Sequence, residues 1–193
     1  RRTFVDNHDR LWGEMLPVPK ERIRAWEPST RFPVPGVRVF PTPGHIAHHV
    51  SYFAEGDGIF LAGDALGVIL APGAPTHPPT PPPSLSVPAW LQTLDEIEPI
   101  GPDLIGPGHF GLHEDFAGRV RQMRERLLAL QERVKEAMTT GDHSDRGVFE
   151  SEVREELAEF RPRDEIDGYF DAFTAAGDWD GMRFYLERAE RSA

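Results

Sequence analysis

Cysteine is absent from this 193-residue sequence, so disulfide bonds, thiolate zinc ligands and a cysteine nucleophile are all excluded. Positive charge is scarce: 21 Lys and Arg face 32 Asp and Glu, and the net charge of −11 argues against binding to nucleic acid. Long apolar runs are also missing. The longest, residues 59–71, is interrupted by Asp64 and is too short to span a bilayer, and residues 1–7 contain no apolar signal segment. We therefore expect an acidic globular protein of the cytoplasm, without nucleic-acid or membrane partners.

The composition of the chain changes near residue 113. Residues 1–113 hold seven of the eight histidines and are rich in proline and glycine, whereas residues 114–193 are densely charged and contain only His143. The strand predicted at 59–62 is apolar throughout, so we expect it to be buried on both faces. The first part as a whole predicts short strands and one helix: strands at 37–40, 49–54, 59–62 and 103–105, and a helix at 87–98.

Residues 114–193 predict a set of helices. Apolar residues recur every three or four positions from Phe116 to Met138, which indicates one helix of about 25 residues that Gly141 ends. Packing of this apolar stripe against the first part is the main interpretation, and a coiled coil with a partner is the alternative. Shorter helices are predicted up to Phe160, around 166–173 and at 178–189, and none of them contains residues that suggest chemistry.

Seven prolines occur among the 13 residues from Ala71 to Pro83. Such a run favours extended backbone and cannot donate the hydrogen bonds of a sheet. We name this segment the proline strap and expect it to lie on the surface as a loop or strap. Recognition by an aromatic groove is the alternative.

Three polar residues stand where predicted strands end: His45, Asp64 and His109. Asp64 is the only charge in an apolar stretch, and a buried carboxylate must be hydrogen-bonded, paired or bound to a cation. Taken singly, Asp64 could cap the following turn, and each histidine could be a hydrogen-bonded loop residue. Taken together at one edge of a sheet, they form a ligand set that suits zinc, iron or manganese. Four short strings surround them in order: Thr42-Pro43-Gly44-His45, Val50-Ser51-Tyr52, Ala62-Gly63-Asp64 and Gly106-Pro107-Gly108-His109.

This ordered set of strings resembles the metallo-β-lactamase superfamily, and within it the glyoxalase II-like hydrolases. The resemblance covers about residues 30–113 and implies an α/β fold: part of an αβ/βα sandwich at 1–113, followed by a helical extension at 114–193 packed on it. It also implies two divalent metal ions, with zinc as the first candidate. By the resemblance His45 ligates one ion, His109 ligates the other, and Asp64 bridges the two.

The sequence departs from the family where the first metal motif, His-x-His-x-Asp-His, belongs. Its only close histidine cluster is His45, His48 and His49, which has a different spacing and no following Asp-His pair. The chain therefore resembles the C-terminal half of such a protein, either as a fragment or as a degenerate relative. The residues that activate the catalytic water are expected in the missing upstream segment. His49 is expected to act behind the metal ligands or to reach the substrate.

Two classes of function follow from these residues. The first is a metal-dependent hydrolase that acts through a metal-bound hydroxide, and the resemblance implies a small-molecule thioester or other ester as its substrate. The second is a non-catalytic binding or assembly protein on a degenerate scaffold of the same kind. In either case we expect this chain alone to be inactive and to associate with its own missing N-terminal segment or with a second copy.

Overall fold

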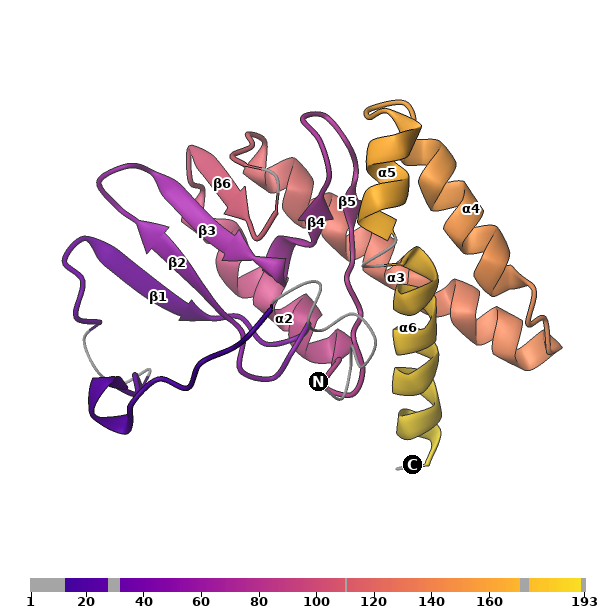
Figure 1. Cartoon of the computed structure of the whole chain (residues 1–193), viewed down its shortest axis with the longest axis horizontal. Helices are drawn as coiled ribbons and strands as arrows, with labels where there is room; N and C mark the ends of the chain where they lie inside the picture. The colour runs from indigo at the N-terminus through magenta and orange to yellow at the C-terminus, as the bar shows by residue number, and fades with distance from the viewer. Residues whose placement is uncertain (1–12, 28–31, 110, 171–173, 192–193) are drawn as a thin grey trace.

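A four-stranded sheet forms the first part of the molecule in the computed structural model, which describes residues 13–27, 32–109, 111–170 and 174–191 (Figure 1). The strand β2 runs antiparallel to both of its neighbours, β1 and β3, and β6 lies parallel to β3 at the edge of the sheet. β2 and β3 form a hairpin. The sheet has the order β1 (Val37–Pro41), β2 (Val50–Ala54), β3 (Ile59–Gly63) and β6 (Leu104–Pro107).

The predicted helices are also present. The long helix α3 has 25 residues and ends at Gly141, which has the positive φ of 71° that favours glycine. Residues 171–173 of the helix predicted at 166–173 lie outside the described residues. Within the described part of the chain, no helix is both long and apolar enough to cross a membrane. The helices are α2 (Val87–Ile97), α3 (Phe116–Thr140), α4 (Asp145–Leu157), α5 (Arg163–Phe170) and α6 (Ala175–Glu190), with short elements η1 (Lys20–Arg22), η2 (Asp64–Leu66), η3 (Glu98–Ile100), β4 (Val68–Ile69) and β5 (Thr76–His77).

One face of the sheet packs against α2 and α3 (Figure 1). Phe60 of β3 and Trp90 of α2 are fully buried, and the Trp90 indole donates a hydrogen bond of 2.8 Å to the carbonyl of Ala65. The apolar stripe of α3 lies in the same core, which confirms core packing as its role. Trp179 of α6 joins this core as well. The boundary at residue 113 stays a prediction, because a single core extends across it.

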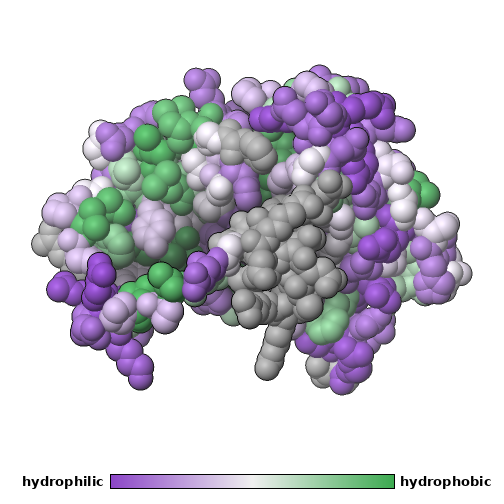
Figure 2. Space-filling view, viewed as in Figure 1, coloured by the Kyte–Doolittle hydropathy of each residue, from purple (hydrophilic) through white to green (hydrophobic). Residues whose placement is uncertain are grey.

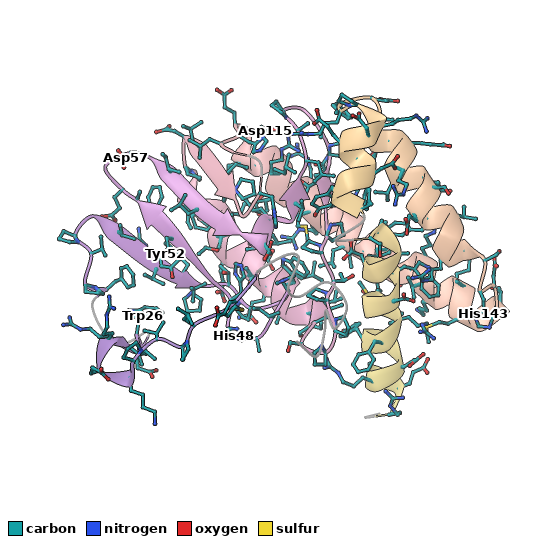
Figure 3. The ribbon with its side chains drawn as sticks, viewed as in Figure 1. Trp26, His48, Tyr52, Asp57, Asp115 and His143 are labelled. Carbon is teal, nitrogen blue, oxygen red and sulfur yellow. The ribbon has the colours of Figure 1, made fainter. Side chains whose placement is uncertain are left out.

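The other face of the sheet corrects the expectation that β3 is buried on both sides. Leu61 is 45% exposed, whereas the neighbouring Phe60 is fully buried. The helices cover only one face of the sheet, and Figure 2 shows hydrophobic residues gathered over the strands on the opposite face. Tyr52 lies directly opposite Leu61 there (Figure 3). The residues that the strand register places on this face are Val37, Val39, Tyr52, Ala54, Ile59 and Leu61.

The proline strap is a second correction, because residues 74–81 within it are buried or half-buried, whereas residues 72–73 and 82–83 are exposed. It lies between the sheet and helices α5 and α6 (Figure 1), and β5 within it pairs with β4. Proline has no backbone N–H, so only the carbonyl groups of these prolines need partners. Side chains from distant elements donate to carbonyls of the strap: Arg119 donates to the carbonyl of Ala74 at 2.6 Å, and Arg188 donates to the carbonyl of Pro83. Donors from distant helices therefore supply hydrogen bonds that a neighbouring strand would otherwise supply to these carbonyl groups.

Candidate functional site

The structure brings His45, Asp64 and His109 together at one edge of the sheet. Because β1, β3 and β6 run in the same direction, the residues that follow them emerge at the same edge. His45 Nε2 lies 3.5 Å from Asp64 Oδ2, and His109 Nε2 lies 3.9 Å from Asp64 Oδ1. Each carboxylate oxygen of Asp64 therefore faces a different imidazole.

This arrangement supplies two ligands to each of two positions rather than three to one. Among the residues that the structure describes, no group of three or more His, Asp or Glu side chains is placed to hold one metal ion. The side chain of His45 is 13% exposed, that of Asp64 is 30% exposed and that of His109 is 38% exposed. These donors would give each of two ions one imidazole nitrogen and one carboxylate oxygen. The ligand roles of the three residues stay a prediction.

The proline strap orients His45. Its Nδ1 lies 2.8 Å from the carbonyl oxygen of Pro79, and because a carbonyl can only accept, Nδ1 carries the proton. Nε2 is then the nitrogen that faces Asp64, and it is the nitrogen that a metal ion would take. The ring also packs edge-on against Trp90, with 5.8 Å between the centroids. The strap thus fixes both the tautomer and the direction of His45.

A chain of hydrogen bonds holds Asp64 from behind. His49 Nε2 accepts the backbone N–H of Asp64 at 3.1 Å, so His49 Nδ1 carries the proton and donates to Thr42 Oγ1 at 2.7 Å. Thr42 in turn lies 2.9 Å from Ser51 Oγ, and Ser51 donates to the carbonyl of Ala62 at 2.9 Å. Every donor in this chain has one acceptor. These hydrogen bonds therefore connect the loop after β1 to the end of β3, which Asp64 directly follows.

His49 thus acts as a positioning residue for Asp64, and its contact with a substrate stays a prediction. Burial lowers the pKa of His49, although the carboxylate of Asp64 works in the opposite direction. A neutral imidazole is what the acceptor role of Nε2 requires. Gly63 permits this contact, because its φ is +54° and a Cβ there would lie 2.7 Å from His49 Nε2. His48 is exposed at the same edge of the sheet (Figure 3).

A cavity of about 630 Å³ opens beside the three residues, and the helical extension forms its opposite wall. Tyr169 of α5 and Asp178 of α6 line it together with His45 and Asp64. Sequence reasoning assigned these helices to packing alone. No motif surrounds Tyr169 or Asp178, and the only signal was the place of Asp178 beside apolar residues of α6.

Both residues on that wall have shifted pKa values. Burial raises the pKa of Tyr169, and the carboxylates of Asp178 and Asp64 raise it further, so the phenol keeps its proton. Burial also raises the pKa of Asp178 to about 7, against the effect of the N–H that Thr80 donates to it. Tyr169 therefore lies within electrostatic reach of both carboxylates, one on each side of the cavity.

Comparison with known proteins agrees with the fold. The family model of the metallo-beta-lactamase superfamily matches residues 27–109. An archaeal metallo-beta-lactamase superfamily protein from Sulfolobus tokodaii is 23% identical, with a TM-score of 0.53 over 67% of this chain and 47% of its own. A metallo-beta-lactamase family protein from Thermus thermophilus is 21% identical, with a TM-score of 0.47 over 80% of this chain and 44% of its own. No curated protein matches the chain in sequence.

The chain spans less than half the length of these two solved structures. The predicted resemblance to the superfamily is confirmed, and so is the fold class of a partial sandwich followed by a helical extension. The finer resemblance to glyoxalase II-like hydrolases stays a prediction. The match also includes all three predicted ligand positions, since His45, Asp64 and His109 fall within it. Over residues 27–109, which are less than half of the chain, the sequence is similar to the metallo-beta-lactamase superfamily.

Proposed function

We propose that the chain carries part of the active site of a metal-dependent hydrolase that acts on a thioester or other ester. The observation that carries this proposal is the position of Asp64, whose two oxygens each face the Nε2 of a different histidine. Zinc is the first candidate, and iron and manganese suit the same donors. When bound, such ions lower the pKa of their water towards 7 and polarise the scissile carbonyl.

The chain's own residues serve this activity by holding the ligands in place. His45 presents Nε2 because the carbonyl of Pro79 accepts a hydrogen bond from Nδ1. Asp64 keeps its position because His49 accepts its backbone N–H. The Asp64 carboxylate then needs no movement to serve two ions, since one oxygen already faces each histidine. Ligands preorganised in this way bind metal without the cost of ordering two loops.

The chain by itself supplies only two ligands per ion, and a catalytic zinc usually has three protein ligands and a water. We therefore propose that the remaining ligands come from a segment with the pattern His-x-His-x-Asp-His, which this sequence does not contain. On this account the isolated chain binds metal weakly and hydrolyses no ester at an appreciable rate.

The second candidate function is a binding or assembly protein on a degenerate scaffold. The lack of a three-residue ligand group among the described residues favours it. The two candidates differ in metal binding. In a hydrolase site, zinc binds with an affinity that depends on Asp64. A degenerate scaffold without the activity would show no zinc binding that depends on Asp64.

A zinc titration of the 193-residue chain separates the two. We expect weak binding by the wild-type chain and a loss of at least about tenfold in Asp64→Asn, because the bridging carboxylate is removed. The matched control is His48→Ala, which removes an exposed histidine from the loop that carries His45 and should leave zinc affinity unchanged. Equal affinity in the wild-type chain and Asp64→Asn would contradict the proposed hydrolase.

A further inference from the structure

The cavity beside the candidate metal site has the size and shape of a ligand pocket. Its volume of about 630 Å³ lies within the range typical of sites for small organic molecules. One end is formed by the loops that carry His45 and Asp64, and the other by the helical extension. A substrate whose ester lies at Asp64 would therefore extend towards α5 and α6.

Most of the wall between these ends is apolar. The rings of Pro79 and Pro81 in the strap face the cavity, and Phe149 and Phe170 line it from the helices. The strap is anchored on this side, because Thr80 donates its backbone N–H to Asp178 Oδ1 at 2.9 Å. Rigid proline and phenylalanine rings suit an aliphatic or aromatic group and offer few hydrogen bonds to a polar one.

The charge of the cavity is one-sided. Its described lining residues include the carboxylates of Asp64, Asp178 and Asp180 but no Arg or Lys. Asp180 is paired, since Arg146 Nε lies 2.9 Å from its Oδ2. Asp178 accepts the N–H of Thr80, and no cation among the described residues pairs with it. A phosphate or carboxylate on a ligand would meet repulsion here, whereas an ammonium group would find a partner.

The position of Asp178 makes such a pairing favourable. Asp178 is half-buried at the cavity wall, and burial raises its pKa to about 7. A charge-assisted hydrogen bond is stronger where water is excluded. Tyr169, whose phenol stays protonated, lies within electrostatic reach of both Asp178 and Asp64.

We infer that this cavity binds the apolar part of the substrate and that this part carries an amine, which pairs with Asp178. The inference rests on the proposed hydrolase function and adds a substrate class to it: an amine-bearing ester or thioester rather than one with a phosphate or carboxylate tail. The helical extension is then the wall that selects the substrate.

The test uses three probes of equal length on the metal-free chain at about pH 8, above the raised pKa of Asp178: hexylamine, hexanol and hexanoate. We expect hexylamine to bind at least about tenfold more tightly than hexanol, and hexanoate to bind most weakly. In Asp178→Asn, whose amide oxygen can still accept the N–H of Thr80, the preference for the amine disappears. The control Asp95→Asn, at a surface pair with Arg124, should keep it.

A second readout needs no variant. Hexylamine should shift the backbone NMR signals of Thr80 and Asp178 in the wild-type chain more than those around His109. The inference would be overturned if hexanoate bound as tightly as hexylamine, or if the preference for the amine survived in Asp178→Asn. NMR shifts centred on His109 would overturn it as well. Loss of the preference in Asp64→Asn but not in Asp178→Asn would place the amine at the metal residues and overturn it as well.

Failure of this inference is distinguishable from failure of the proposed function. Zinc affinity depends on Asp64 in the proposed site and should be unchanged in Asp178→Asn. A chain that keeps Asp64-dependent zinc binding but shows no amine preference would contradict only the substrate class. A chain whose amine preference is present but whose zinc binding is independent of Asp64 would contradict the hydrolase.

Discussion

The two walls of the cavity are built in different ways. On the sheet side, Asp64 and His49 are held by hydrogen bonds that join residues within 42–64, and each donor has its acceptor. On the helical side, Asp178 meets the strap only across a separation of 98 residues, and it is half-buried without a cation among the described residues. In the functions we propose, the first wall positions metal ligands and the second wall binds the substrate. Local sequence encodes the first, and only the tertiary fold creates the second.

The largest expected effect comes from the sheet side. In a protein that contains this chain together with a His-x-His-x-Asp-His segment, Asp64→Ala should lower the turnover of a generic thioester by at least about a thousandfold, or about 4 kcal/mol. The physical reason is the loss of the one carboxylate that faces both histidines. The measurement is kcat at saturating zinc.

Thermal unfolding of the same variant supplies the control. Removal of Asp64 should leave stability nearly unchanged, because the carboxylate is costly to bury without cations. Leu94→Ala, at a fully buried position of α2, should instead lower the free energy of unfolding by about 3 kcal/mol. Unchanged turnover in Asp64→Ala at saturating metal would refute its bridging role.

The helical side should respond most strongly to pH. Burial and the charge of Arg126 lower the pKa of His77 in the strap to about 4, although Glu156 Oε2, 3.7 Å from its Nε2, raises it. The folded protein therefore prefers neutral His77, and the stability this provides is present above about pH 6.5 and is lost as the pH falls towards 4. The full effect is about 3 kcal/mol, and urea unfolding between about pH 7 and pH 4 measures it.

Asp178 should act in the opposite direction over part of the same range. Its pKa is raised to about 7, so the folded state holds a proton that the unfolded state releases, and stability falls as the pH rises from about 4 to 7. His77→Gln should therefore become more stable as the pH falls from about 7 to 4. Asp178→Asn should lose stability over the same range more steeply than the wild-type chain does. Parallel pH profiles in the wild-type chain and both variants would show that neither group is perturbed in this way.

A smaller effect tests the contact between Gly63 and His49. Gly63→Ala places a Cβ 2.7 Å from His49 Nε2 at a φ of +54°, and it should lower the free energy of unfolding by about 2 kcal/mol. Gly56→Ala is the matched control in the neighbouring turn, where a Cβ would meet nothing within 4 Å. If the two variants are equally stable, the hydrogen-bond chain behind Asp64 is less rigid than the structure indicates.

The sequence predicts the sheet side of the molecule well, for physical reasons. The position of polar residues at strand ends is a local signal, and it predicts that His45, Asp64 and His109 lie at one edge of the sheet. The apolar stripe of α3 likewise predicts a helix from Phe116 and its burial.

The strap, β3 and the helical wall could not be predicted in the same way. Seven prolines predict extended backbone, but whether that backbone is covered depends on Arg119 and Arg188 from distant helices. The exposure of Leu61 depends on which face the helices cover. Asp178 becomes a cavity residue only because α6 folds back on the strap.

The most direct test of the account is a crystal structure of the chain soaked in zinc, with anomalous scattering used to locate the ions. We expect peaks beside Asp64, with zinc bonded to its carboxylate and to Nε2 of His45 or His109 at about 2.0–2.2 Å. Zinc found only at other histidines, such as His143 at the far end of the helical region (Figure 3), would contradict the account.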